Sequence, residues 1–158
     1  MSKIYGVLAG SAVAGAVTGW MARVLWLWSI AEGERSCADS VALCFSLFPF
    51  AGIGLWVVLA VPVLLLALWL LDVRPLKAMV TASFALQWFI IVVLAGLSRR
   101  DLPESMALNV GAMAVGPVLV ALCADPVRRR AGLVAVGVLV TVSLFLVWFS
   151  IHVSGYFL

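Results

Sequence analysis

The chain has 158 residues, of which 66% are hydrophobic and only 11% charged, with a formal net charge of +3. So small a polar fraction excludes a soluble globular domain, because too few polar side chains are present to cover its surface. The length suits one compact unit and no linker rich in Pro, Ser or Gly divides it, so we expect a single transmembrane domain over 1–158.

Two membrane spans are predicted in the first half of the chain. About 20 apolar residues cross the hydrocarbon core as a helix, and the first such segment is 4–28. The next apolar run, 41–71, is too long for one upright crossing. We therefore divide it into an interfacial helix over 41–48 and a span over 50–71, with Pro49 in the first turn of that span.

Three further spans follow, separated by the charged turns DVRPLK, RRDLPES and DPVRRR. None of the apolar runs alternates in polarity as the strands of a membrane β-barrel do. The fold class is therefore all-α: a polytopic integral membrane helical bundle of about five transmembrane helices. The three later spans are 78–98, 105–124 and 131–151.

The distribution of Lys and Arg predicts the orientation in the membrane. With the N-terminus cytoplasmic and the C-terminus outside, more basic residues lie inside than outside, as the positive-inside rule requires. The excess of Arg over Lys and the abundance of Ala, Val and Leu favour a bacterial inner (plasma) membrane. The basic start also has the form of a cleaved signal peptide, but the apolar run extends to Ile30, which favours an uncleaved span. The inner set is Lys3, Arg74, Lys77, Arg128, Arg129 and Arg130, and the outer set is Arg35, Arg99 and Arg100.

A polar cluster is predicted near the outer surface. Arg23 is the one charge well inside an apolar stretch, and a charge in the membrane is costly enough to suggest a function. Asn109 and His152 are expected at a similar depth, so the three could line a cavity for an anionic headgroup, a quinone or a peptide. The alternative is that Arg23 reaches the headgroups or pairs with Glu32 or Glu34. The tryptophans of the outer half would then form an interfacial belt; they are Trp20, Trp26, Trp28, Trp56 and Trp148.

Small residues on the first span predict close helix packing. Gly15 and Gly19 form a G-x-x-x-G pair within a stripe of small residues, and such pairs let helix backbones approach closely in lipid. We expect this stripe to be a docking face. Near the middle of the third span, the Gln87 amide is expected to join helices by hydrogen bonds. The hydroxyls of the spans are expected to bond to their own backbone; they are Thr81, Ser83, Thr141 and Ser143.

Cys37 and Cys44 are both predicted on the outer side, where a structural disulfide is favoured in an oxidising compartment. A bridge requires 37–40 to fold back, because a continuous helix would hold the two residues too far apart. Two free thiols or a redox pair are the alternatives. The sequence has no metal-ligand cluster, no catalytic triad pattern and no phosphate-binding loop, so no catalytic residue and no cofactor is assigned.

The function expected from these features is a small accessory or scaffold subunit that docks laterally in a larger membrane protein complex. Its partners would be membrane lipids and other membrane subunits or further copies of itself, not nucleic acid. An oligomeric channel or transporter component is the alternative, favoured by Pro62, Pro117 and a weak repeat in which 60–72 resembles 114–125. A membrane enzyme that binds lipid or quinone near Arg23 and His152 is a third reading.

Overall fold

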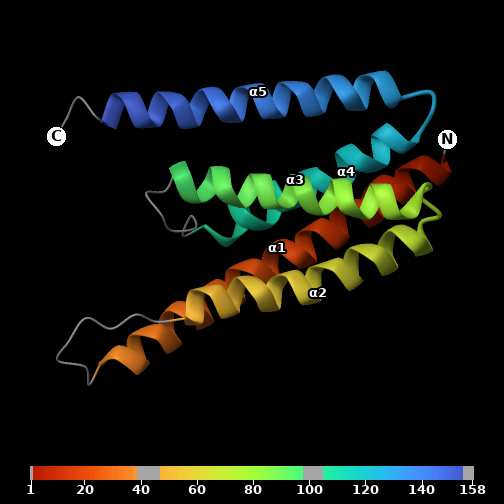
Figure 1. Cartoon of the computed structure of the whole chain (residues 1–158). Coiled ribbons are helices and arrows are strands. Elements are labelled where there is room, and N and C mark those ends of the chain that lie inside the picture. The colour runs from red at the N-terminus through yellow and green to blue at the C-terminus, as the bar shows by residue number, and fades with distance from the viewer. Residues whose placement is uncertain (1, 39–46, 98–104, 155–158) are drawn as a thin grey trace.

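The computed structural model describes residues 2–38, 47–97 and 105–154, and all regular secondary structure in these segments is helical. Five helices are present, and each is long and apolar enough to cross a membrane. The expectation of an all-α architecture with five such helices is therefore confirmed. The helices run back and forth, so that the N-terminus and the α2–α3 and α4–α5 turns lie at the same end (Figure 1).

Helix α1, Ser2–Cys37, is longer than the predicted first span. Its 36 residues extend roughly 54 Å along the axis, against about 30 Å for the hydrocarbon core. The segment 29–37, which carries charged residues, continues the helix instead of forming a connection. Arg35 pairs with Glu32 at 3.2 Å, and the Ser36 hydroxyl donates to the Glu32 carbonyl. The helix does not end at the apolar boundary because the ion pair joins neighbouring turns and because this segment includes good helix formers, namely Ala31, Glu32, Glu34 and Arg35.

Helix α2, Phe48–Leu70, begins with Pro49 in its first turn, as predicted. Of the interfacial helix expected over 41–48, the part up to residue 46 lies outside the described residues. The helix ends in a Schellman motif: Val73 N–H donates to the Leu68 carbonyl and Asp72 N–H to the Trp69 carbonyl. Asp72 has a φ of 52°, a left-handed conformation that Asp tolerates better than most residues.

The second half of the chain follows the predicted boundaries closely. Helices α3, Leu76–Leu97, and α4, Met106–Ala124, start within two residues of the predicted spans. Ser105 caps α4 by accepting a hydrogen bond from Leu108 N–H at 3.3 Å. Asp125 opens the turn to α5, Arg129–Ser154, by accepting from Val127 N–H at 3.0 Å.

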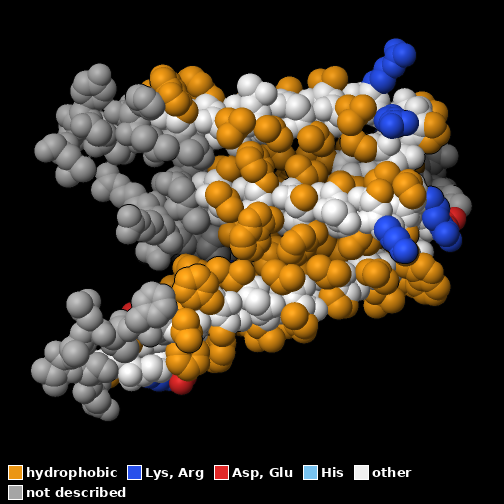
Figure 2. All heavy atoms as spheres, viewed as in Figure 1, with side chains coloured by type: hydrophobic (Ala, Val, Ile, Leu, Met, Phe, Trp, Pro, Cys, Tyr) orange, Lys and Arg blue, Asp and Glu red, His pale blue; other side chains and the backbone are white. Residues whose placement is uncertain are grey.

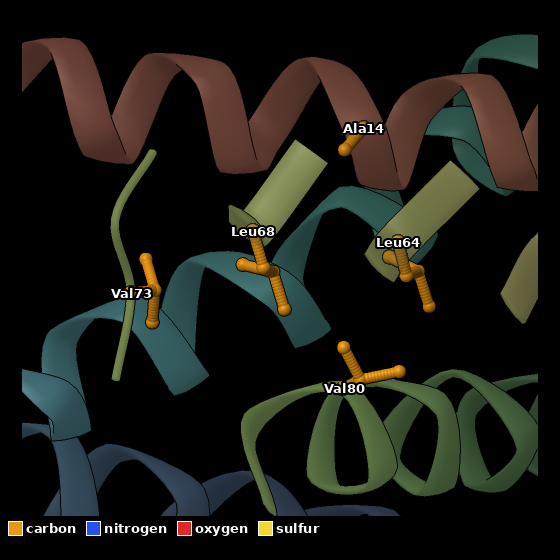
Figure 3. Close-up of a cluster of buried hydrophobic side chains, with 5 residues drawn as sticks. All are labelled: Ala14, Leu64, Leu68, Val73 and Val80. Carbon is orange, nitrogen blue, oxygen red and sulfur yellow. The ribbon is translucent and has the colours of Figure 1, made fainter. Parts of the chain in front are cut away.

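Helix α1 is central to the packing, with α2 and α4 against it, whereas α3 bridges α2 and α4. Side chains from α1, α2, the following turn and α3 meet in one apolar cluster: Ala14, Leu64, Leu68, Val73 and Val80 (Figure 3). Helix α5 lies along the edge of the bundle, in contact with α4 and α3 (Figure 1). Hydrophobic side chains extend along the face of the bundle seen in Figure 2, and most visible Lys and Arg side chains gather at the end that holds the N-terminus.

Candidate functional site

Four helices meet around a buried group of polar atoms. We call this the polar node and define it as Thr18 of α1, Trp56 of α2, Gln87 of α3 and the main-chain carbonyl of Met113 in α4. The side chains of Thr18 and Gln87 are fully buried. Gln87 Nε2 donates to Thr18 Oγ1 at 2.6 Å and to the Met113 carbonyl at 3.3 Å. The expectation that the Gln87 amide joins helices is confirmed.

Pro117 explains why the Met113 carbonyl accepts this bond. Proline has no backbone N–H, so Pro117 cannot donate to the carbonyl four residues earlier, which is that of Met113. Inside a membrane, no water is available to donate a hydrogen bond to this carbonyl. The Gln87 amide, on a neighbouring helix, supplies the missing donor. Thr18 completes the node because its hydroxyl donates to the Gly15 carbonyl at 2.9 Å while accepting from Gln87.

Trp56 joins α2 to the polar node. Its indole N–H donates to the Thr18 carbonyl at 3.0 Å, and its ring stacks on Phe84 and Trp88 at centroid distances of 5.3 and 6.2 Å. Only 3% of Trp56 is exposed, so this residue does not belong to the interfacial belt in which the sequence placed it. Its position in the sequence, within a uniformly apolar helix, gives no signal for this burial.

The structure assigns different surroundings to the three residues of the predicted outer cluster. Arg23 is half-buried on α1, and Asn109 is 3% exposed on α4. They belong to the same end of the α1–α4 interface, because the Asn109 carbonyl lies beside Gly19, one turn before Arg23. The Asn109 side chain donates to the Ser105 carbonyl at 3.1 Å. The backbone of His152 lies on α5, whose C-terminal end is well separated from that of α1 (Figure 1).

Gly15 and Gly19 face α4 at close range. A Cβ atom built on Gly15 would lie 2.7 Å from both the Ala114 Cα and the Met113 carbonyl oxygen, and one on Gly19 would lie 2.6 Å from the Met113 Cβ. Only glycine permits this approach of the two backbones. The small-residue stripe of α1 is therefore covered by the chain's own α4. The opposite side of α1 exposes Val13, Val17 and Trp20.

Helix α5 packs much less tightly than α1. In the most apolar window of α1, 28% of the residues are buried, against 6% in that of α5. Helices α4 and α5 pack closely only next to the turn that joins them, where a Cβ on Gly132 would lie 2.8 Å from Cys123 Sγ. Farther along α5, a pocket of about 170 Å³ opens between it and its neighbours. Its lining is apolar apart from one hydroxyl: Ile90, Val93, Leu94, Ala112, Val115, Leu139 and Ser143.

The predictions for the hydroxyl groups of the spans are confirmed only in part. Thr81 and Thr141 donate to the carbonyls four residues earlier, at 3.0 and 2.9 Å, as expected. The prediction for Ser83 is wrong, because its hydroxyl has no hydrogen-bond partner among the residues that the structure describes. The predicted disulfide stays a prediction: Cys37 is the last residue of α1, whereas Cys44 lies outside the described residues.

Across the segments that the structure describes, no group of three or more His, Cys, Asp or Glu side chains could hold a metal ion. Comparison of the chain with protein-family models, with curated proteins and with solved structures gives no match.

Proposed function

We propose that this protein is a small accessory subunit that docks laterally into a larger membrane protein complex through α5. The observation that carries the proposal is a pair of small residues on the exposed side of that helix. Gly137 and Thr141 lie one turn apart, and a Cβ built on Gly137 would meet nothing within 4 Å. The Thr141 hydroxyl is satisfied by the Gly137 carbonyl, so its hydrogen bond needs no partner.

A partner helix fits this surface better than lipid alone. Burial of hydrocarbon does not drive helices together inside a bilayer, whereas close backbone contact between small residues does. Val134, Val138 and Phe145 flank the Gly137–Thr141 pair and are all more than half exposed. They would pack on either side of an approaching helix. The occupant that we assign is therefore an apolar transmembrane helix of another polypeptide.

Gly54 on α2 is an open glycine that lacks this feature. It also meets nothing within 4 Å, but the residues four positions before and after it are Phe50 and Val58. Large side chains on both sides of the glycine hold a second backbone away. This position therefore serves as a control for the α5 surface.

We further propose a bacterial inner membrane as the location, with the N-terminus in the cytoplasm and the C-terminus outside. Support for the orientation comes from basic residues at the α2–α3 and α4–α5 connections, at the end where the N-terminus lies: Arg74, Lys77, Arg128, Arg129 and Arg130. The positive-inside rule assigns this end to the cytoplasm. A topology reporter fused after Lys77 should give a cytoplasmic signal, and a periplasmic signal would reverse the assignment.

The docking proposal is tested by purifying the tagged chain from its native membrane in mild detergent. Wild type should retain a stoichiometric partner, and Gly137→Leu should lose it because the bulky side chain keeps the partner helix away. Gly54→Leu, an equally exposed change on α2, should retain it. A partner lost equally from both variants, or from neither, would refute docking through α5.

A further inference from the structure

The end of the bundle that holds the N-terminus carries a concentration of positive charge, most of it visible in Figure 2. We call it the basic patch and define it by five residues at the α2–α3 and α4–α5 connections: Arg74, Lys77, Arg128, Arg129 and Arg130. The same connections contain two acidic residues, Asp72 and Asp125, so basic residues exceed acidic ones by three.

The two connections are held together by the apolar core beneath them. Val73, between Asp72 and Arg74, is buried and belongs to the apolar cluster drawn in Figure 3. Ala124, which directly precedes Asp125, packs against the same cluster. The basic patch is therefore one surface, although its two halves are far apart in the sequence.

Little in the protein balances this charge. Arg74 pairs with Asp72 at 3.2 Å, and both side chains are largely exposed. The other four basic residues of the patch have no ion pair within the segments that the structure describes. Helices α3 and α5 both start here, and neither has an acidic residue in its first turn. The positive ends of two helix dipoles therefore add to the charge of the side chains.

The basic patch also borders exposed apolar side chains. Val127 directly precedes Arg128 and is 88% exposed, and Trp69 and Leu70 at the end of α2 are more than half exposed. Tryptophan favours the boundary between hydrocarbon and headgroups. A nucleic acid or another soluble polyanion would leave these side chains in water, whereas a membrane surface places hydrocarbon beside the headgroup phosphates. The combination of charge and apolar surface therefore fits a lipid.

We propose that the basic patch binds the headgroup of an anionic phospholipid. Arginine suits the headgroup phosphate, because a guanidinium can donate two parallel hydrogen bonds to its oxygens. The acyl chains would lie along the apolar sides of the helices. A zwitterionic lipid also has a phosphate, but its own cationic group leaves no net charge to balance that of the patch. This binding is independent of docking through α5 and holds for either orientation in the membrane.

Native mass spectrometry of the full chain in mild detergent tests the proposal. The chain is titrated with phosphatidylglycerol, which is anionic, or with phosphatidylcholine, which is zwitterionic, and the Kd of the first bound lipid is measured. Each basic residue near an anionic lipid contributes roughly a fivefold preference. Phosphatidylglycerol should therefore bind at least about fivefold more tightly than phosphatidylcholine. Equal Kd values for the two lipids would overturn the proposal.

Single substitutions place the binding on the basic patch. Lys77→Gln and Arg130→Gln, one at each connection, should each weaken phosphatidylglycerol binding by roughly fivefold and leave phosphatidylcholine binding unchanged. Arg35→Gln is the matched control, because Arg35 lies near the opposite end of α1 and pairs with Glu32. All three substituted side chains are exposed, so the fold does not depend on them. An equal loss of binding in Arg35→Gln would assign the effect to net charge alone and overturn the proposal.

A competition experiment separates a lipid site from a site for a soluble anion. Inorganic phosphate at the same concentration as phosphatidylglycerol should not displace the bound lipid, because it makes no apolar contact with the border of the patch. Displacement by inorganic phosphate would assign the basic patch to a soluble anion and overturn lipid binding.

Discussion

Two pairs of small residues, each one helical turn apart, have opposite surroundings in this protein. Gly15 and Gly19 of α1 lie so close to α4 that an added Cβ would come within 2.7 Å of it, whereas Gly137 on α5 has nothing within 4 Å. The same local pattern thus forms a core in one place and an open surface in the other. The difference is that α1 and α4 are held in close backbone contact, while this face of α5 is left open within the chain.

The largest loss of stability is expected at Gly15 and Gly19, the pair in close contact with α4. Gly15→Leu and Gly19→Leu should each destabilise the chain by roughly 1–3 kcal/mol or more, because the added side chain collides with the α4 backbone or with Met113. Val17→Leu on the exposed side of α1 should have little effect. Thermal unfolding in detergent measures all three. Equal tolerance would mean that α1 and α4 are not in close contact.

A smaller effect is expected at the polar node, within the same closed region. Gln87→Leu removes the donors to Thr18 and to the Met113 carbonyl and should cost roughly 1–2 kcal/mol. Pro117→Ala restores a backbone donor to that carbonyl, so Gln87→Leu should cost less in the Pro117→Ala background. A double-mutant cycle measures the coupling. Strictly additive costs would show that the amide does not compensate for the proline.

Helix α5 contains both kinds of glycine, because Gly132 is in close contact with α4 whereas Gly137 is open. Gly132→Leu should destabilise the α4–α5 hairpin by about 1–3 kcal/mol, since a Cβ there already lies 2.8 Å from Cys123 Sγ. Gly137→Leu should change the stability of the isolated chain by less than about 0.5 kcal/mol. The ratio of the two shifts in unfolding midpoint checks the contrast. A large loss of stability from Gly137→Leu alone would mean that this face is covered within the chain.

The smallest expected change concerns the end of α1 beyond the bundle core. We expect Cys37 and Cys44 to form a bridge, so protein isolated without reductant should be lighter by two hydrogens than reduced protein. Intact-mass spectrometry measures this difference, with Cys37→Ser as the control in which it disappears. Two alkylatable thiols at these positions in unreduced protein would exclude the bridge.

The helices themselves were predictable because runs of about 20 apolar residues and the turns between them are visible in hydropathy. Local chemistry also identified the proline in the first turn of α2. The end of α1 was not predictable from hydropathy, since charged residues after Trp28 continue a helix in water as readily as they end a span.

The packing partners could not be predicted, because helices that are apolar all round do not distinguish a lipid-facing side from a buried one. Trp56 and Trp20 are equivalent in hydropathy, yet one is buried in the node and the other is half exposed. One signal was available: Gln87 and Pro117 both lie mid-span, and a proline always frees a carbonyl for a donor from outside its own turn.

The central claim is that α5 meets another polypeptide, and site-specific photo-cross-linking in native membranes tests it most directly. A photo-reactive residue replacing Val138 on α5 should form an adduct with a second, different polypeptide, whereas one replacing Val58 on α2, which is similarly exposed, should not. An adduct with a second copy of this chain would contradict an accessory role. No polypeptide adduct at position 138, or equal adducts at both positions, would contradict docking through α5.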